Sequence, residues 1–414
     1  MTGDQIEAPG LPDLSAAQAA ARLGVKPETL YAYVSRGLLS RRRSTGGSRF
    51  DALEVEAFAR SRRPARSSAA SAATGHSPGT PLMAIDHDIT LIEDDRLYYR
   101  GRDAAELAET ADVETVCWWL WTREWQPGRR FAATESGAEA TAAVRLTLPP
   151  GMSPRAQLQA QVPVLAATDP LRHDLSPGSV ARMGAEIVAG AVTALPALGP
   201  DVPESAGLAA RLWPRLTPRR ADDDEFRLVN AALVLLLDHD LAASTLAVRA
   251  AASARANPYA VVCCGLGALD SALHGNAGRA AYGLIGRRLA GEPADQAIAG
   301  AVIEHGTVPG FGHRIYRHAD PRCDQLIGRL REARPESPAV VAADELVAAV
   351  RSRMPAFPNV DFALATAVLA LDLDPGAGEL IFALARCGGW LAHALAEYAE
   401  PPLRLRPEGR YTGP

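Results

Sequence analysis

The fold of most of the chain is decided by residues 225–254, which have the sequence EFRLVNAALVLLLDHDLAASTLAVRAAASA. Apolar residues run almost continuously through this stretch, and residues that favour helices dominate it. Because the run is far too long for a strand, it predicts a buried helix. Helical patterns recur in three further segments, residues 105–125, 344–354 and 378–399. The sequence therefore predicts a mostly α-helical body.

Strand signals are nearly absent from this body. The best is DITLIEDDRLYYRG, residues 88–101, which predicts a short hairpin around Asp94 and Asp95. Strands and helices do not alternate, and the sequence contains neither GxGxxG nor a P-loop. These observations exclude a Rossmann-type nucleotide-binding sheet, and we expect the all-α class.

The composition is that of an ordinary soluble globular protein, with 414 residues, 48% of them hydrophobic and 22% charged. No run of 18 apolar residues occurs, and the N-terminal segment has no apolar signal-peptide core. We therefore expect a cytoplasmic protein without a membrane partner. The five cysteines are odd in number and lack CxxC spacing, which supports neither disulfides nor a metal site. The apolar surroundings of Cys263 and Cys264 predict buried thiols.

Charge divides the chain into two parts. Residues 1–70 hold eleven Arg or Lys against seven Asp or Glu, whereas the remainder has a net charge of −9. Residues 61–80 are rich in Ser, Ala, Pro and Gly and show no apolar periodicity, which is typical of a flexible linker. We infer a basic head of about 60 residues and a larger acidic body.

The head has the pattern of a helix–turn–helix module. Ser15 precedes Gln18 by three residues, which predicts a capping box for a helix through Leu23. Pro27 then opens a second helix, PETLYAYVSRG, which ends at Gly37.

Two short Arg-rich arms follow on either side of a Gly46-Gly47 turn, as in a wing, and Asp51 can cap a third helix through Phe58. The head resembles the winged helix–turn–helix head of MerR-type regulators and excisionases. In such modules the second helix enters the major groove, and the wing contacts the DNA backbone. The alternatives are a solvated Arg-rich surface and a module retained for protein contacts. The candidate phosphate-contacting residues are Arg36, Arg41, Arg42, Arg43 and Arg49.

In the body, imidazoles and a carboxylate lie on turns marked by Gly or Pro, where catalytic residues often occur. A general base beside neutral donors suits proton abstraction next to a carbonyl, and nearby arginines suit a di- or tricarboxylate. Each residue alone also fits a structural role, as a surface His or a helix-capping Asp. The segments are LLLDHDLAAST with His239, GLGALDSALHGNAG with His274, VPGFGHRIYRHADPRCD with His313 and Arg322, and FPNVDFALA with Asp361.

From about residue 82 to the end, the body resembles citrate synthase. The order and spacing of the segments fit the family along the whole body, and together they are highly specific. The segments that carry the resemblance are ITLIEDDRLYYRGRDAAELAE, DHDLAAST, LDSALHGNAG, VPGFGHRIYRHADPR, FPNVDFALA, ALARCGGWLAHALAE and RLRPEGRYTG.

The resemblance implies a role for each site residue. Asp361 matches the base that takes a proton from the acetyl-CoA methyl group. His274 matches the donor that stabilises the enol at the thioester oxygen, and His313 matches the group that polarises the oxaloacetate carbonyl. The matches to oxaloacetate ligands are His239, Arg322, Arg386 and Arg406, the last supplied across the dimer. The implied reaction of the tricarboxylic acid cycle needs no cofactor, because the coenzyme A thioester is itself a substrate.

The resemblance also implies the architecture, which is an intertwined homodimer with large and small helical domains. We predict a winged helix–turn–helix domain at residues 12–62, a linker at 63–80, a large domain at 81–276 and 386–414, and a small domain at 277–385.

The sequence departs from the family pattern where the acyl pocket and the coenzyme A loop would be shaped. Two alternatives therefore stay open, a 2-methylcitrate synthase that uses propionyl-CoA and a DNA-binding regulator whose body senses ligand without turnover. The departing residues are Ala242, Asn276, Ala277, Gly278, Arg279, Ala363, Leu364 and Ala365.

Overall fold

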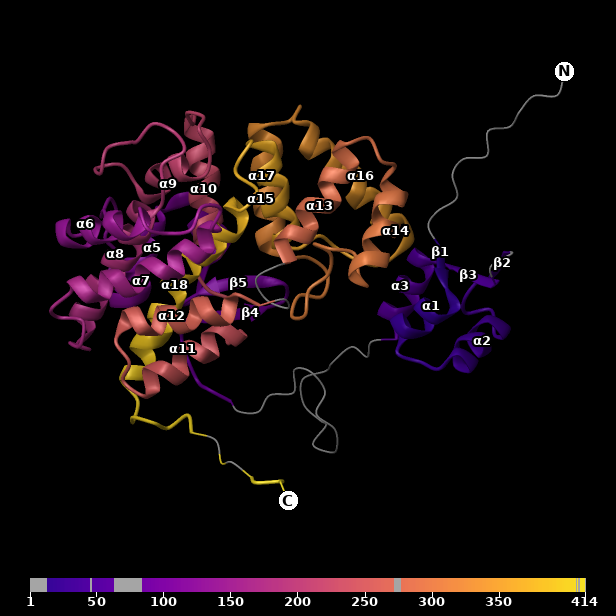
Figure 1. Cartoon of the computed structure of the whole chain (residues 1–414), viewed down its shortest axis with the longest axis horizontal. Helices are drawn as coiled ribbons and strands as arrows, with labels where there is room; N and C mark the ends of the chain where they lie inside the picture. Colours follow the sequence, from indigo (N-terminus) through magenta and orange to yellow (C-terminus); the bar gives the residue numbers. More distant parts are fainter. Residues whose placement is uncertain are drawn as a thin grey trace.

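The computed structural model describes residues 13–44, 47–62, 84–271, 277–406, 408 and 410–413 (Figure 1). The predicted linker at 63–80 and Gly46 of the predicted wing turn lie outside these residues. Within the described residues, the head combines three short strands with three helices, and its antiparallel sheet has the order β1-β3-β2. Its elements are β1 (Asp13–Ser15), α1 (Ala16–Leu23), α2 (Pro27–Ser35), β2 (Arg42–Ser44), β3 (Gly47–Asp51) and α3 (Ala52–Ser61).

The local signals of the head act as the sequence predicts. The Ser15 side chain accepts from the Gln18 amide and the Gln18 side chain accepts from the Ser15 amide, which closes the capping box of α1. Pro27 stands in the first turn of α2, and Asp51 caps α3 by accepting from the first-turn amides. Strands β2 and β3 are the two arms of the wing, with Ser44 opposite Gly47. The pairing of β1 with β3 was not predicted.

The body begins with a small antiparallel sheet. Strands β4 (Thr90–Glu93) and β5 (Arg96–Tyr99) form the predicted hairpin, and β6 (Arg102–Asp103) pairs with β5. Asp94 and Asp95 make the turn with positive φ angles of 49° and 57°, a conformation that Asp tolerates better than most residues. The hairpin prediction is confirmed.

Helices make up nearly all the rest of the described body, as predicted. The first group is α4 (Ala104–Thr110), α5 (Val113–Thr122), α6 (Glu135–Arg145), α7 (Pro154–Thr168), α8 (Pro177–Ala194), α9 (Leu208–Leu212), the 3₁₀ turn η1 (Trp213–Arg215), α10 (Asp223–Leu235), α11 (Ala243–Ser253) and α12 (Pro258–Leu269). The second group is α13 (Ala277–Leu289), α14 (Ala294–His305), α15 (Pro321–Ala333), α16 (Pro338–Arg353), α17 (Val360–Ala370) and α18 (Ala377–Tyr398).

The stretch 225–254 forms two helices, so the prediction of one continuous helix was wrong. Helix α10 ends at Leu235, α11 begins at Ala243, and the intervening loop turns at Asp240 with a φ of 58°. The loop lies against α18, where an added Cβ at Gly389 would be 2.2 Å from the Leu237 carbonyl oxygen. Glycine at this position therefore leaves room for the loop, which its amide also holds by donating to the Leu237 carbonyl at 3.1 Å.

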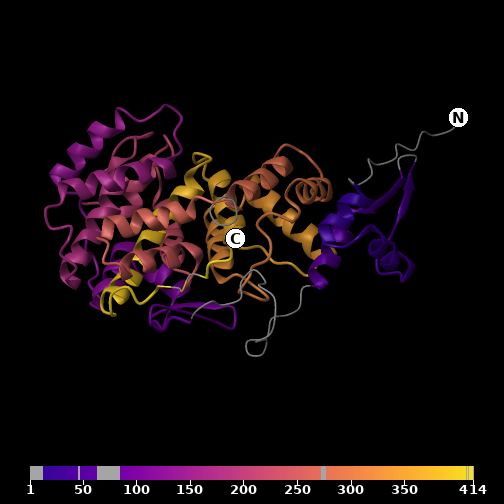
Figure 2. The ribbon, with the colours of Figure 1, turned by 60° about the horizontal axis from the view of Figure 1, so that its bottom comes forward.

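Two apolar clusters hold the fold together. One joins the first helix group to α18, α15 and one face of α17, and the fully buried Trp390 of α18 packs against Gly265 of α12. The other unites the head with α13, α14, α16 and the remaining face of α17. In both views the head lies at one end of the molecule beside α14, opposite the first helix group (Figures 1 and 2). The predicted boundaries of the large and small domains remain predictions.

Two further observations concern the surface. Cys264 is exposed and Cys263 is partly buried, so the prediction of buried thiols was wrong for Cys264. Both lie on α12, whose other side packs into the core. Among the described residues, no helix combines the length and apolar character needed to span a bilayer.

Candidate active site

His313 follows a tight turn whose glycines are required by geometry. Gly310 and Gly312 have φ angles of 76° and 78°, which favour glycine. A Cβ at Gly310 would also lie 2.8 Å from the Cβ of Phe362. The turn is joined to residues 357–359 by the Gly312 amide, which donates to the Phe357 carbonyl at 2.7 Å. The chain before α17 thereby fixes the position of His313.

The imidazole of His313 is neutral, and its tautomer is set by the backbone. Nδ1 accepts from the amides of Ile315 at 3.0 Å and Tyr316 at 3.3 Å, which places the remaining proton on Nε2. Burial, assisted by the charge of Arg322, lowers the pKa of His313 to about 4. At neutral pH the residue therefore offers an Nε2–H donor without a positive charge.

His239 faces His313 from the loop between α10 and α11. The two ring centroids are 5.0 Å apart, and His239 Nε2 is 3.1 Å from the hydroxyl of Tyr316. Burial lowers the pKa of His239 well below its usual range, and the charges of Arg322 and Arg386 lower it further. Two neutral imidazoles from distant segments thus meet at one place.

Arg322 lies at the start of α15 in a buried ion pair. Its Nε and Nη2 donate to the two carboxylate oxygens of Asp320 at 2.9 Å and 2.8 Å. Asp320 also accepts from the Val360 amide at 3.0 Å, which ties the pair to α17. Burial alone would lower the pKa of Arg322, but Asp320 raises it, so the guanidinium stays charged.

Arg386 is a buried cation that leaves two of its donors unused among the described residues. It lies fully buried on α18, with its guanidinium 4.7 Å from the ring centre of Phe382. Its Nε and Nη1 have no hydrogen-bond partner among the described residues. Because unpaired buried donors are costly, this geometry fits an anionic ligand that supplies the acceptors.

Asp361 stands in the first turn of α17. Asn359 caps this helix by accepting from the Asp361 amide at 3.0 Å, and its side-chain amide donates to the Gly312 carbonyl at 2.9 Å. Burial raises the pKa of Asp361 to about 6. The carboxyl group is therefore a stronger base than an ordinary Asp, while still largely ionised at pH 7.

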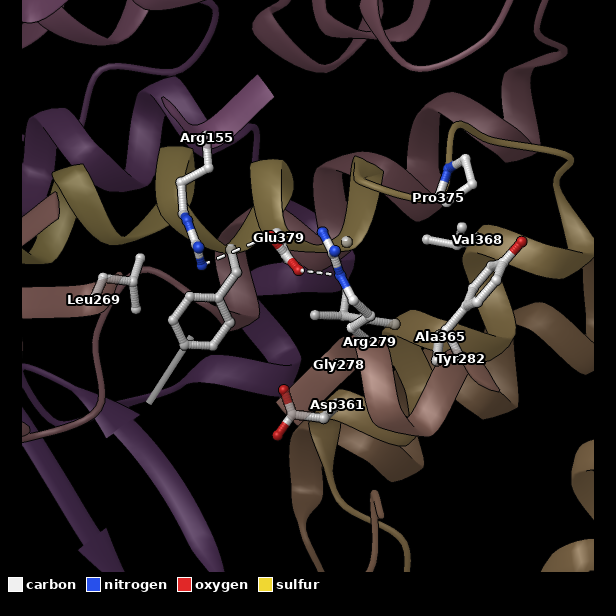
Figure 3. A pocket seen from close by; sticks show the side chains of 13 residues that line it. Arg155, Leu269, Gly278, Arg279, Tyr282, Asp361, Ala365, Val368, Pro375 and Glu379 are labelled. Atoms are coloured by element: carbon white, nitrogen blue, oxygen red, sulfur yellow. Dashed lines mark hydrogen bonds and ion pairs between the residues drawn. The ribbon is translucent and has the colours of Figure 1, made fainter. Parts of the chain in front are cut away.

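A small cavity of about 30 Å³ adjoins Asp361 between α13, α17 and α18 (Figure 3). Its lining next to the carboxylate is mainly apolar. On its far side Glu379 lies between Arg155, with Nη1 at 3.6 Å, and Arg279, with Nε at 3.3 Å. The lining includes Leu269, Gly278, Tyr282, Leu364, Ala365, Val368 and Phe382.

The structure brings together some of the predicted site residues and not others. His239, His313, Arg322, Arg386 and Asp361 converge, since the charges of Arg322 and Arg386 act on the His239 imidazole and on the Asp361 carboxyl group. His274 and Asn276 lie outside the described residues. Arg406 is exposed in the C-terminal segment and makes no hydrogen bond or ion pair with any described residue.

The head arginines form no part of this site. Arg36, Arg41, Arg42 and Arg43 are exposed, and Arg49 is partly exposed. Arg42 pairs with Asp13 at 2.5 Å.

Sequence reasoning missed several supporting residues. Asp320 caps α15 directly before Pro321, and this Asp-Pro pattern predicts a helix start. The pattern does not predict that Asp320 pairs with Arg322. The pair formed by Asp238 and His393, at 3.2 Å beneath His239, left no local signal. Across the described ranges, no group of three His, Cys, Asp or Glu side chains is arranged to hold a metal ion.

Comparison with known proteins identifies the family of the chain. Residues 80–408 match the family described as citrate synthase, C-terminal domain, and residues 14–63 match a helix-turn-helix domain. Citrate synthase 2 of Bacillus subtilis is 29% identical over 352 residues, covering 80% of this chain and 94% of the relative. The 2-methylcitrate synthase of Mycobacterium tuberculosis is 26% identical over 336 residues, covering 77% of this chain and 84% of the relative.

Solved structures share the fold. Citrate synthase from Thermoplasma acidophilum, in a ternary complex with carboxymethyl coenzyme A and oxaloacetate, matches with a TM-score of 0.64 and 23% identity. The match covers 80% of this chain and 94% of that one. The family match spans most of the chain, and a helix-turn-helix domain precedes it. The chain therefore belongs to the citrate synthase family.

Proposed function

We propose that the protein condenses acetyl-CoA with oxaloacetate and hydrolyses the resulting thioester to citrate and free coenzyme A. The observation that carries this proposal is the convergence of two neutral imidazoles, an arginine with unused buried donors and a carboxyl group of raised pKa. Membership of the citrate synthase family supports it.

Oxaloacetate is a dianion, and the cationic side of the site suits it. The unpaired Nε and Nη1 donors of Arg386 point along different edges of the guanidinium and can donate to separate ligand oxygens. Arg322 adds a second charge whose orientation is fixed by Asp320. His239 then contributes a neutral hydrogen-bonding group at the same ligand.

The chemistry begins at the methyl group of the thioester. The Asp361 carboxylate takes a methyl proton, and His274, by its match to the family, donates to the thioester oxygen as the enol forms. The methyl carbon then bonds to the ketone carbon of oxaloacetate, while the Nε2–H of His313 donates to the ketone oxygen. Water finally cleaves the carbon–sulfur bond and releases coenzyme A as a thiol.

The cavity beside Asp361 is where the acyl group of the thioester would lie, so its size affects the choice between acetyl-CoA and propionyl-CoA. Its lining beside the carboxylate is mainly apolar and its volume is about 30 Å³, which suits a short acyl chain without separating acetyl from propionyl. Propionyl-CoA, the substrate of a 2-methylcitrate synthase, is therefore the second candidate. The ratio of kcat/KM for the two thioesters separates them.

Release of free thiol tests the proposal directly. Purified full-length protein is incubated with oxaloacetate and either acetyl-CoA or propionyl-CoA, and a thiol reagent measures free coenzyme A. We expect thiol release that depends on oxaloacetate. Absence of release with both thioesters would overturn the enzymatic proposal and favour a ligand-sensing body.

We also propose a homodimer whose subunits share their sites. Helices α11 and α12 expose a face of small or apolar side chains without charge, including Leu246, which is 47% exposed. Such a face fits a self-complementary interface. Beyond Leu403, whose amide donates to the Ser253 carbonyl at 2.8 Å, the chain carries Arg406 free to reach a partner.

A second candidate function is DNA binding by the head. It is supported by the exposure of the face that carries α2 and the wing. Helix α2 packs within the head, and the wing strand β2 is exposed along its length. The exposed arginines of this face suit phosphate contacts. A mobility shift at low salt, with full-length protein, tests this function.

A further inference from the structure

The head is joined to the body through the helix that follows its wing. Helix α3 packs on α14 and α16, and Val55, fully buried, belongs to an apolar cluster that continues into the body. Among the described residues, α2 and the wing strands make no extensive contact with a body helix, so the head docks mainly through α3 and leaves the opposite face free (Figures 1 and 2).

A buried carboxylate organises the polar part of this junction. The side chain of Glu56 on α3 is 1% exposed and lies between two arginines. Arg22 of α1 donates to Glu56 Oε2 through Nε at 2.7 Å, and Arg60 donates to Glu56 Oε1 at 3.0 Å. Because Glu56 fixes both guanidinium groups, the direction of Arg60 is determined by the fold of the head.

Arg60 points out of the head and onto the turn that carries His313. Its Nη2 is 3.3 Å from the Thr307 hydroxyl and 3.5 Å from the Phe311 carbonyl oxygen. Its Nη1 occupies the space where a Cβ of Gly312 would stand, at 2.7 Å. The guanidinium therefore packs on the residue directly before His313.

The turn at residues 310–312 is also held on its other side, by the segment that leads into Asp361. The Asn359 amide donates to the Gly310 carbonyl at 2.8 Å, and the Asn359 side chain both donates to Gly312 and caps the helix of Asp361. The turn thus lies between a residue of the head and the cap of α17. A shift of this turn would move His313 and Asn359 together.

We propose that Arg60 is a positioning residue for the reaction, through which the helix–turn–helix head fixes the His313 turn. The head then contributes to the reaction by positioning the His313 turn and does not itself contact substrate. The kinetic part of this inference rests on the proposed condensation, whereas its structural part does not.

The kinetic test compares Arg60→Ala with Arg62→Ala in the full-length protein. Arg62 is the matched control, since its side chain contacts Tyr33 and Phe58 within the head. We expect Arg60→Ala to lower kcat by about three- to tenfold, as the loss of long, partly exposed contacts suggests, with both KM values within about twofold. Arg62→Ala should match the wild type, and Arg60→Lys should recover part of the loss because it keeps a cation beside Glu56.

A second test needs no turnover. Hydrogen exchange is measured over residues 307–316 and 355–362, where the Gly312 and Asn359 amides bond across the turn. We expect faster exchange in Arg60→Ala than in Arg62→Ala. Should Arg60→Ala lose the fold of the head, Thr307→Val serves instead, because it removes an acceptor of Arg60 from the body side.

The outcomes are distinct. Slower turnover with faster exchange in Arg60→Ala supports the proposal. Exchange and kcat equal to those of Arg62→Ala, a change in KM alone, or faster exchange without a change in kcat would each overturn it. If the wild type itself releases no thiol, the proposed condensation fails, and the exchange measurement alone decides whether the head fixes the turn.

Discussion

Replacement of Asp361 by Asn removes the charge of the candidate base while keeping the shape of the side chain. Burial raises the pKa of Asp361 from 3.8 to about 6, so the ionised carboxylate is less stable in the folded protein than in the unfolded chain. This cost is fully present above the folded pKa. It decreases as the pH falls and disappears below the unfolded pKa, where both states bind the proton.

The size of the effect follows from the two pKa values. The difference between 3.8 and about 6 corresponds to roughly 3 kcal/mol of unfolding free energy at pH 7, and linkage reduces it to about 1.5 kcal/mol at pH 5. Asp361→Asn should therefore stabilise the protein by up to these amounts. Turnover should fall at least about a hundredfold, since general-base catalysis is lost.

Urea unfolding at pH 7 and pH 5, together with thiol release, measures both effects. Asp86→Asn is the matched control, because Asp86 is exposed and has no hydrogen bond or ion pair with a described residue. The reasoning is refuted if Asp361→Asn is no more stable than the wild type at pH 7, or if its gain does not shrink at pH 5. Persistent turnover would show that another group is the base.

Three further predictions concern pH, the anion site and the head. The carboxylate form of Asp361 is lost as the pH falls through about 6. We therefore expect kcat/KM to drop about tenfold between pH 7 and pH 5, as for the binding of one proton. A midpoint below pH 5 in the pH–rate profile would contradict the assignment of Asp361 as the base. Arg386→Ala should raise the KM for oxaloacetate at least about tenfold. A mixture of Arg386→Ala and Arg406→Ala subunits should recover activity once subunits exchange. A mixture that is no more active than its two components would argue against shared sites. If the head binds DNA, the Arg41→Ala/Arg43→Ala double variant should bind DNA more weakly at low salt. The slope of log binding constant against log salt concentration should fall by about two, because two phosphate contacts are lost. An unchanged mobility shift would exclude those contacts.

Much of the local structure could be predicted from the sequence, because its causes lie within a few residues. The capping box of Ser15 and Gln18, the Pro27 start of α2 and the Asp94-Asp95 hairpin depend on hydrogen bonds and backbone preferences between near neighbours. The mostly helical character of the body follows from long apolar runs. Recognition of the site likewise depended on short motifs whose order along the chain is preserved.

The limits of the sequence appear where distant segments meet. The stretch 225–254 favours one helix by composition, but the loop carrying His239 is held by contact with Gly389, more than a hundred residues further on. No local pattern predicts that contact. The pairing of Asp320 with Arg322 and of Asp238 with His393 depends in the same way on burial that only the packed helices create.

The sequence by itself determined the helical class, the two-part organisation and the identity of the candidate catalytic residues. Only the tertiary structure decided their chemical state: a neutral His313 with its proton on Nε2, a basic Asp361 and an Arg386 with unused donors. It also decided that the head reaches the His313 turn through Arg60. The physical reason is that protonation and hydrogen-bond partners are set by burial and by neighbouring charges, which come from segments far apart in the chain.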